Sequence, residues 1–248
     1  MRHRIRGREW PLWQHGLLFP PPSESALTFG SRKGKEDSIT RARALWEAHL
    51  DLVRRCEAHP FVQGIASGEL PRERFVFYVE QDAFFLEAFA RAYALGLAKA
   101  PDRETMNAFR ELLQGVFEEL RLHEGYAARW GANLHPEPAP ATQAYTDFLL
   151  RVAALEPVGH LVAAMTPCMR LYAHLGTFLR PRTNPASPYR EWVETYSSAE
   201  FEALARRLEA LLDRLPGEEE AQRALYRAAL RFELAFFEAA WQATDRSG

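Results

Sequence analysis

The sequence predicts an all-α protein built as a single helical-bundle domain. Apolar residues recur at steps of three and four almost throughout residues 40–241, whereas alternating, strand-like runs are scarce. Prolines and glycines separate most of the periodic segments, as they commonly do between helices. With 248 residues, 47% of them hydrophobic, the chain is long enough to bury one large core. We therefore expect about seven or eight helices around that core.

The boundaries of these helices follow from start and stop signals. Leu45 and Leu52 lie on one apolar stripe, so we expect a helix from Thr40 onward. Ser197 and Glu200 have the spacing of a capping box, so a helix should begin there and end before the Pro-Gly pair at 216–217. The remaining helices are expected at residues 71–99, 103–130, 142–155, 158–179 and 218–241, with loops at 131–140 and 181–188.

Residues 1–38 differ from the rest of the chain. They hold four of the 16 prolines and seven basic residues against four acidic ones, without a sustained helical period. The difference gives this arm about +3, so the remainder of a chain with net charge −2 carries about −5. We interpret residues 1–38 as a mobile or irregular basic, proline-rich arm and residues 39–248 as the all-helical domain.

Composition and charge exclude several classes of function. The 31 basic and 33 acidic residues nearly cancel, without the clustered basic surface that nucleic acid or an anionic membrane would need. There is no uncharged apolar run of about 18 residues, and prolines interrupt any secretory signal. Cys56 and Cys168 lie far apart without metal-ligand spacing, and the glycines form no phosphate loop. We expect a cytoplasmic protein with reduced thiols, no cofactor, and no membrane or nucleic-acid partner.

Acidic residues interrupt two of the apolar stripes. Asp82 lies three positions from both Val79 and Phe85 on one predicted helix. Glu233 occupies a similar position in the last helix, and Glu238 is comparable, so the pattern does not choose between them. Burying an unpaired carboxylate is very costly, so each needs a partner or a raised pKa. Structural ion pairs would satisfy this need, and so would a polar pocket between facing helices.

Cys168 follows a proline inside the predicted helix 158–179. Pro167 either begins a helical segment, which would put the thiol near a positive helix end and favour thiolate, or kinks a continuous helix. Tyr172, four residues on, faces the same side. On spacing alone, an inert buried cysteine is the commoner outcome.

A second spacing, that of Glu119 and His123, is compatible with binding a metal ion from one helical face. A di-iron site in a helical bundle would need carboxylates from several helices and a second Glu/His pair, which the sequence lacks. We therefore interpret the two residues as an ion pair on the helix surface and predict no metal site.

Five segments occur together in an order and spacing that are far more specific than any one of them. They are His59–Ile65 continuing through Gly68–Pro71 to Phe75–Asp82, then Glu119–His123, Pro167–Tyr172, Thr195–Tyr196 and Phe232–Phe236. Over roughly residues 45–241 this order resembles the TenA/thiaminase II family. The resemblance implies a haem-oxygenase-like helical fold, a homotetramer, and hydrolysis of small pyrimidine substrates derived from thiamin.

The resemblance also implies a set of site residues. Cys168 would be the nucleophile, Glu233 rather than Glu238 would face the site, and Asp82 would hold the pyrimidine. Phe85 departs from family members that carry tyrosine there, which removes a hydroxyl from the expected hydrogen-bond pattern. The implied substrate-binding residues are Tyr145, Tyr172, Tyr196, Phe85 and Phe236.

The implied substrate carries a leaving group on an exocyclic methylene, as in 4-amino-5-aminomethyl-2-methylpyrimidine. Direct displacement of the amine is poor, but addition of a thiolate to an electron-poor ring carbon lets ring electrons expel it, and water then adds to the methylene. This route needs an activated thiol, a carboxyl that protonates the departing nitrogen, and a group that manages charge on the ring nitrogens. We assign these roles to Cys168, Glu233 and Asp82 in that order. Intact thiamin is a second candidate substrate.

Two alternatives stay open at this point. An iron-dependent oxygenase on the same helical fold would need a second cluster of Glu and His, and it would not need Cys168. A non-enzymatic regulatory protein would give residues 1–38 a role, although the folded region has no basic helix suited to a DNA groove. Iron content separates the first alternative from a thiol hydrolase, and deletion of residues 1–38 tests the second.

Overall fold

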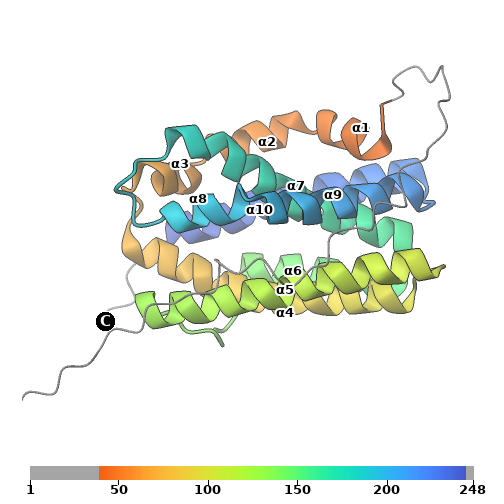
Figure 1. Cartoon of the computed structure of the whole chain (residues 1–248), viewed down its shortest axis with the longest axis horizontal. Coiled ribbons are helices and arrows are strands. Elements are labelled where there is room, and N and C mark those ends of the chain that lie inside the picture. Colours follow the sequence, from red (N-terminus) through yellow and green to blue (C-terminus); the bar gives the residue numbers. More distant parts are fainter. Residues whose placement is uncertain (1–38, 244–248) are drawn as a thin grey trace, which may run out of the picture. The chain divides into compact units, whose positions relative to one another are not determined.

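The computed structural model describes residues 39–243, and these fold as an all-α bundle without a strand (Figure 1). The predicted arm at residues 1–38 lies outside the described residues. No helix among residues 39–243 is long and apolar enough to cross a membrane. The described helices, in chain order, are α1 (Arg41–Glu47), α2 (Leu50–Glu57), α3 (Pro60–Ser67), α4 (Arg72–Ala98), α5 (Arg103–Trp130), α6 (Pro140–Leu155), α7 (Val158–Leu179), the short 3₁₀ helix η2 (Arg180–Arg182), α8 (Arg190–Tyr196), α9 (Ala199–Arg214) and α10 (Glu219–Gln242).

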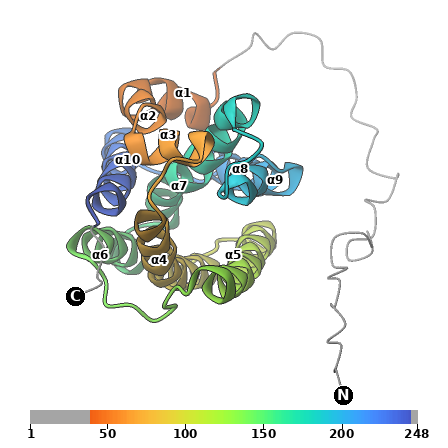
Figure 2. The same cartoon turned by 90° about the vertical axis from the view of Figure 1, so that its left-hand side faces the viewer.

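Helix α7 lies in the middle of the bundle when it is viewed end-on (Figure 2). It packs against α6, α8, α9 and α10, and most of its residues are buried. On one side of it, α4 packs along both α5 and α6, and on the other side lie the short helices α1 to α3. Side chains from helices far apart in the sequence therefore meet in one interior.

The single helix predicted from Thr40 onward is wrong, because the chain turns within this segment and forms two helices, α1 and α2. Thr40 caps α1 through its side chain, but the chain bends at Ala48 and His49 before α2 begins. The periodicity continues across this bend because both helices bury the same side against the core. Together with α3 and α8, this break explains why the described helices outnumber the expected seven or eight.

The His-Pro-Phe run at residues 59–61 has a structural role at the start of α3. Nδ1 of His59 accepts a hydrogen bond from the backbone N–H of Phe61, so Nε2 carries the proton and donates to Glu238 on α10 at 2.9 Å. Pro60 occupies the first helical position, where a missing N–H costs nothing. The run thus starts α3 and ties it to α10.

Helix α9 begins one residue later than the capping-box spacing predicts. Ser198 rather than Ser197 is its cap, accepting a hydrogen bond from the backbone N–H of Phe201, while Ser197 closes α8. At the far end of α5, Gly131 adopts a left-handed φ of 72°, a conformation that glycine adopts without steric penalty. The ends of the other long helices lie within two residues of the expected ones.

Pro167 lies inside α7, so the continuous helix is the alternative that the structure adopts. Proline has no N–H, so it cannot complete the helical hydrogen bond to the carbonyl four residues earlier. The neighbouring Thr166 hydroxyl donates to the carbonyl of Val162 at 2.7 Å. Cys168 consequently lies in the middle of a 22-residue helix, far from its positive end.

Helices α7 and α8 approach each other closely at Gly176. A Cβ atom at this position would lie 2.4 Å from the carbonyl carbon of Tyr196 and 2.5 Å from the nitrogen of Ser197. Both are backbone atoms that cannot rotate away, so only glycine fits. The contact fixes the end of α8, where Tyr196 points into the bundle.

We expect Gly176→Ala to lower the free energy of unfolding by about 1 to 3 kcal/mol, because the added methyl group overpacks a backbone contact. Gly125→Ala is the matched control, since this exposed glycine of α5 has open space around it and alanine favours a helix by about 0.5–1 kcal/mol. Urea unfolding measures both. A Gly176→Ala variant as stable as the wild type would contradict the close approach.

Candidate active site

A small cavity lies among α4, α5, α7, α8 and α9. Five of the predicted residues line it: Asp82, Phe85, Cys168, Tyr172 and Tyr196. Neither lysine nor arginine occurs among the lining residues, so its charged groups are carboxyls. The rest of the lining consists of Leu86, Phe89, Glu119, Met169 and Phe201.

The Cys168 thiol hydrogen-bonds to the carboxyl of Glu233, which reaches it from α10. Burial raises the pKa of Cys168 well above its ordinary value, and three nearby carboxylates raise it further. The thiol is therefore protonated in the empty site. No helix end acts on it, so its activation depends on a group that takes its proton, and Glu233 is in place to do so.

Glu233 lies on the inner face of α10 and is only 2% exposed. Its Oε1 accepts a hydrogen bond of 2.7 Å from the hydroxyl of Tyr145 on α6. Burial raises the pKa of Glu233 to about 7, which suits a carboxyl that both takes and gives protons near neutral pH. Glu238 is exposed on the other face of α10, paired with His59. Of the two glutamates, Glu233 is the one inside the bundle.

Asp82 is buried, and its Oδ2 lies 3.0 Å from Nε2 of His123 on α5. Nδ1 of His123 lies 3.0 Å from the carbonyl oxygen of Glu119, so Nδ1 must carry a proton and donate it there. Burial lowers the pKa of His123, but the hydrogen bond and the charge of Asp82 outweigh it, and the pKa is raised. The pair is thus an imidazolium held against a carboxylate.

The predicted ion pair between Glu119 and His123 is wrong. Glu119 accepts a hydrogen bond of 2.6 Å on Oε1 from the Tyr196 hydroxyl, while His123 turns to Asp82. Each side chain finds its partner on a neighbouring helix, because both point into the bundle. Burial, followed by the Asp82 charge, raises the pKa of Glu119 to about 7.

Glu119 and His123 are therefore site residues that the sequence reasoning missed. The signal was present, since they continue the buried stripe of α5 that runs through Leu112, Val116 and Tyr126. The same criterion, a polar residue on an apolar stripe, identifies Asp82 and leaves Glu233 and Glu238 as alternatives. On α5 a spacing of four also fits a pair on the helix surface, so the spacing alone does not reveal that Glu119 and His123 point inward.

The tyrosines of the site are linked to one another. The Tyr78 hydroxyl donates to that of Tyr172 at 3.3 Å, and Nε1 of Trp192 donates to Tyr78 at 3.2 Å. The rings of Tyr172 and Tyr196 meet edge to face, with centroids 4.8 Å apart. These contacts hold the phenols rigidly around the cavity.

The remaining predicted residues lie behind the cavity wall. Tyr145 and Phe236 are buried but do not line the cavity. The Phe85 ring lies 4.8 Å from that of Tyr145 and 6.1 Å from that of Phe236. Tyr145 also stacks on Phe232 at 5.2 Å. Tyr145 therefore acts on the site through Glu233, and Phe236 through Phe85.

Both cysteines are free, and Cys56 is buried in the core, where burial raises its pKa to about 12. Among residues 39–243, no three or more His, Cys, Asp or Glu side chains gather in an arrangement able to hold a metal ion. The Glu119 side chain is hydrogen-bonded to Tyr196 and that of His123 to Asp82, so the two residues do not form the pair that their spacing in α5 would allow.

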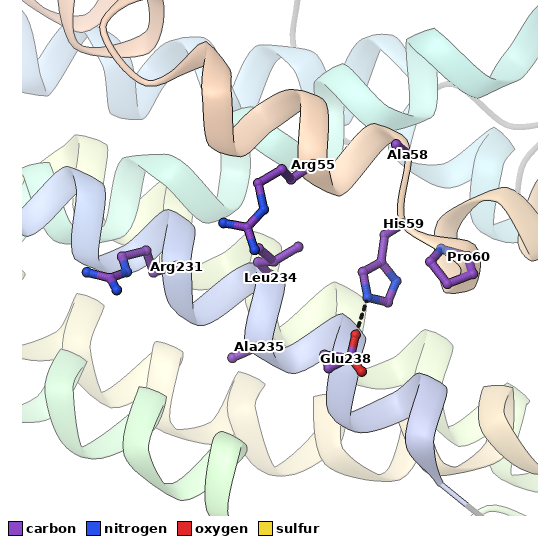
Figure 3. A pocket seen from close by; sticks show the side chains of 8 residues that line it. All are labelled: Arg55, Ala58, His59, Pro60, Arg231, Leu234, Ala235 and Glu238. Atoms are coloured by element: carbon purple, nitrogen blue, oxygen red, sulfur yellow. Dashed lines mark hydrogen bonds and ion pairs between the residues drawn. The ribbon is translucent and has the colours of Figure 1, made fainter.

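A wider groove lies on the surface between the α2–α3 junction and α10 (Figure 3). This groove is open to solvent. Arg55 and Arg231 lie along it, and the bond between His59 and Glu238 crosses it. None of the predicted site residues lines this groove, so the internal cavity is the candidate active site.

Comparisons with known proteins agree with this geometry. A sequence profile of the TENA/THI-4/PQQC family matches residues 46–243. The aminopyrimidine aminohydrolase of Halalkalibacterium halodurans is 38% identical over 180 residues, covering 70% of this chain and 77% of that protein. The solved structure of a TenA homologue protein from P. horikoshii has a TM-score of 0.77 at 29% identity, covering 82% of this chain and 99% of that one. Haem oxygenase-1 from Synechocystis, at 19% identity, covers 81% and 92% with a TM-score of 0.55, which confirms the predicted haem-oxygenase-like fold.

The raised pKa of Glu233 makes stability depend on pH. The folded protein keeps this proton up to about pH 7, whereas the unfolded chain releases it near its ordinary pKa of 4.5. The free energy of unfolding should therefore fall as pH rises between these values. Glu233→Gln should reduce that fall by about 1 to 3 kcal/mol, measured by urea unfolding at both ends of the range.

Glu238→Gln is the matched control on the outer face of α10. The bond to His59 lowers the pKa of Glu238. The stability that the ionised Glu238 carboxylate contributes is therefore lost only as pH drops below the window tested. The fall between pH 4.5 and 7 should thus persist in this variant. An equal effect of both substitutions would contradict the buried, protonated state of Glu233.

Proposed function

Because the chain belongs to the TENA/THI-4/PQQC family, we propose that it is an aminopyrimidine aminohydrolase of thiamin salvage. Its reaction would convert 4-amino-5-aminomethyl-2-methylpyrimidine and water to the 5-hydroxymethyl pyrimidine and ammonia. The observation that carries this proposal is the contact between the Cys168 thiol and the Glu233 carboxyl beside a cavity that Asp82 also lines. A nucleophile, an acid–base group and a polar anchor for the ring are then within one small site.

The first half of the reaction begins with proton transfer. Glu233 takes the thiol proton as the sulfur of Cys168 adds to an electron-poor ring carbon, which leaves the ring with an extra electron pair. That pair expels the nitrogen from the methylene and leaves an exocyclic double bond. The arm nitrogen, protonated as an alkylamine is at neutral pH, leaves as neutral ammonia and then takes the proton held by Glu233 to become ammonium. Tyr145 keeps the carboxyl oriented throughout, through its bond to Oε1.

The second half returns the site to its starting state. Water adds to the methylene carbon and gives its proton to Glu233. The electron pair returns through the ring and expels the thiolate, which takes the proton back from Glu233. One carboxyl therefore serves both halves as base and acid, which its pKa of about 7 allows. No atom or electron is left over.

The other groups position the ring. Asp82, held by His123, accepts hydrogen bonds from the amino edge of the pyrimidine and stabilises charge on the ring nitrogens. Tyr172 and Tyr196 line the cavity, orient the ring and order the attacking water. Phe85 supplies aromatic surface against the ring, and Phe236 supports it from behind. Phenylalanine at 85 offers surface without a hydrogen bond.

The wider assignments belong to the same proposal. Residues 39–248 would form the catalytic unit and residues 1–38 an arm outside it. We expect a homotetramer in the cytoplasm, which light scattering on the purified protein and fractionation of cells would test. No observation favours the iron oxygenase or the regulatory protein, since similarity to haem oxygenase extends to the fold alone.

We expect the wild-type protein to release ammonia from 4-amino-5-aminomethyl-2-methylpyrimidine and Cys168→Ala to release at least about 10³-fold less, because the nucleophile is removed. Its helical circular dichroism spectrum should not change. Cys56→Ala is the matched control: it removes the other buried thiol and should keep turnover within a few-fold.

Normal turnover by Cys168→Ala would remove the thiol mechanism. Absence of turnover by folded, reduced wild-type protein would remove the proposed function. Stoichiometric iron in protein purified without chelators would then support the oxygenase.

A further inference from the structure

Glu119 is a cavity carboxyl that the proposed mechanism does not use. It reaches the cavity from α5 and lines it together with Cys168 and Asp82. The Tyr196 hydroxyl holds its Oε1 at 2.6 Å. Within residues 39–243 its second oxygen, Oε2, accepts no hydrogen bond. The carboxyl is thus fixed in place with one acceptor free for a ligand.

The charges around the cavity do not cancel. Three carboxyls act on the Cys168 thiol, namely Asp82, Glu119 and Glu233. Asp82 is matched by His123, and Glu233 is bound by Tyr145 and by the thiol itself. Among the described residues, the only hydrogen-bond partner of the Glu119 carboxyl is a neutral phenol. The charge of His123 also acts on Glu119, but the His123 ring is bound to Asp82, and neither lysine nor arginine lines the cavity, so a cationic ligand would add the missing charge partner.

We propose that Glu119 determines substrate specificity by binding the ammonium group on the methylene arm of the substrate. This inference rests on the proposed function, whose substrate carries an alkylamine that is protonated at neutral pH. The free Oε2 accepts a hydrogen bond from the ammonium, and Tyr196 prevents the carboxyl from turning away. Asp82 holds the ring and Glu119 the arm, so the carbon–nitrogen bond that breaks is fixed at both ends.

Binding the cation also selects the reactive form of the substrate. An ammonium group leaves directly as neutral ammonia, whereas an unprotonated amine would leave as an anion unless Glu233 protonated it while the bond breaks. The site should therefore prefer a cationic arm to a neutral one of the same size. The pKa of Glu119, raised to about 7 by burial and by Asp82, would fall when the cation binds and so leave the carboxylate ionised.

The test compares two pyrimidines that differ in one group: the cationic 5-aminomethyl substrate and the neutral 5-hydroxymethyl product. Calorimetry on the full chain carrying Cys168→Ala measures both affinities without turnover. This protein should bind the cation more tightly than the neutral alcohol. Adding Glu119→Gln keeps the acceptor for Tyr196 but removes the charge. It should weaken binding of the cation about 10- to 100-fold and binding of the alcohol less than about twofold.

Glu118→Gln is the matched control. It makes the same substitution one residue earlier on α5, at an exposed glutamate that contacts Gln114 and Arg121 outside the cavity. Both affinities should stay within about twofold of their starting values. Glu119→Asp, which keeps the charge, should retain the preference for the cation.

If Glu119→Gln weakened the binding of both ligands equally, Glu119 would have a structural role and the inference would be overturned. The inference would also be overturned if protein with Glu119 unchanged bound the two ligands equally, a result that requires no new variant to fold. Loss of the preference for the cation in Glu119→Asp would overturn it too. These results are independent of turnover. Absent ammonia release from wild-type protein would refute the proposed function without altering the measured selectivity.

Discussion

Three carboxyl groups lie in or beside one cavity of a bundle whose other interior side chains are mostly apolar or aromatic, and each keeps a hydrogen-bond partner there. A buried carboxyl without a partner would destabilise the fold by several kcal/mol. Asp82 of α4 is held by His123 of α5, Glu119 of α5 by a phenol of α8, and Glu233 of α10 by a phenol of α6. Every one of these bonds joins two different helices. The requirement to satisfy the acids therefore also fixes the arrangement of the helices around α7.

This arrangement explains how a cysteine can be a nucleophile without the usual means of lowering a thiol pKa. Cys168 has neither a helix N-terminus nor a basic residue beside it, and the carboxyls around it make thiolate less favourable. In the proposed mechanism the thiol reacts only when a proton acceptor and an electron-poor ring are both present. The protonated thiol is the unreactive form of the sulfur, and keeping it protonated limits oxidation and alkylation.

Much of the helical architecture follows from the sequence, because one buried face per helix leaves a clear period of three and four. The same period identifies Asp82 as an acid on an apolar stripe, but it leaves Glu233 and Glu238 as alternatives, and only the family resemblance favours Glu233. The sequence period does not reveal the hydrogen-bond partners of these acids. His123 lies 41 positions from Asp82, and only the packing of α4 on α5 brings them together. Likewise, the sequence allows Pro167 to begin a helix or to interrupt one, and tertiary packing decides.

Trp192 adds an optical property to the site. Its indole is 2% exposed, donates to Tyr78, and lies with its ring 4.7 Å from that of Tyr196 and 5.7 Å from that of Tyr172. Both of those tyrosines line the cavity. The fold has thus placed a natural fluorophore one ring away from any occupant, in surroundings that a ligand would perturb through the tyrosines. Binding to this cavity can be followed by intrinsic emission, without labelling the protein.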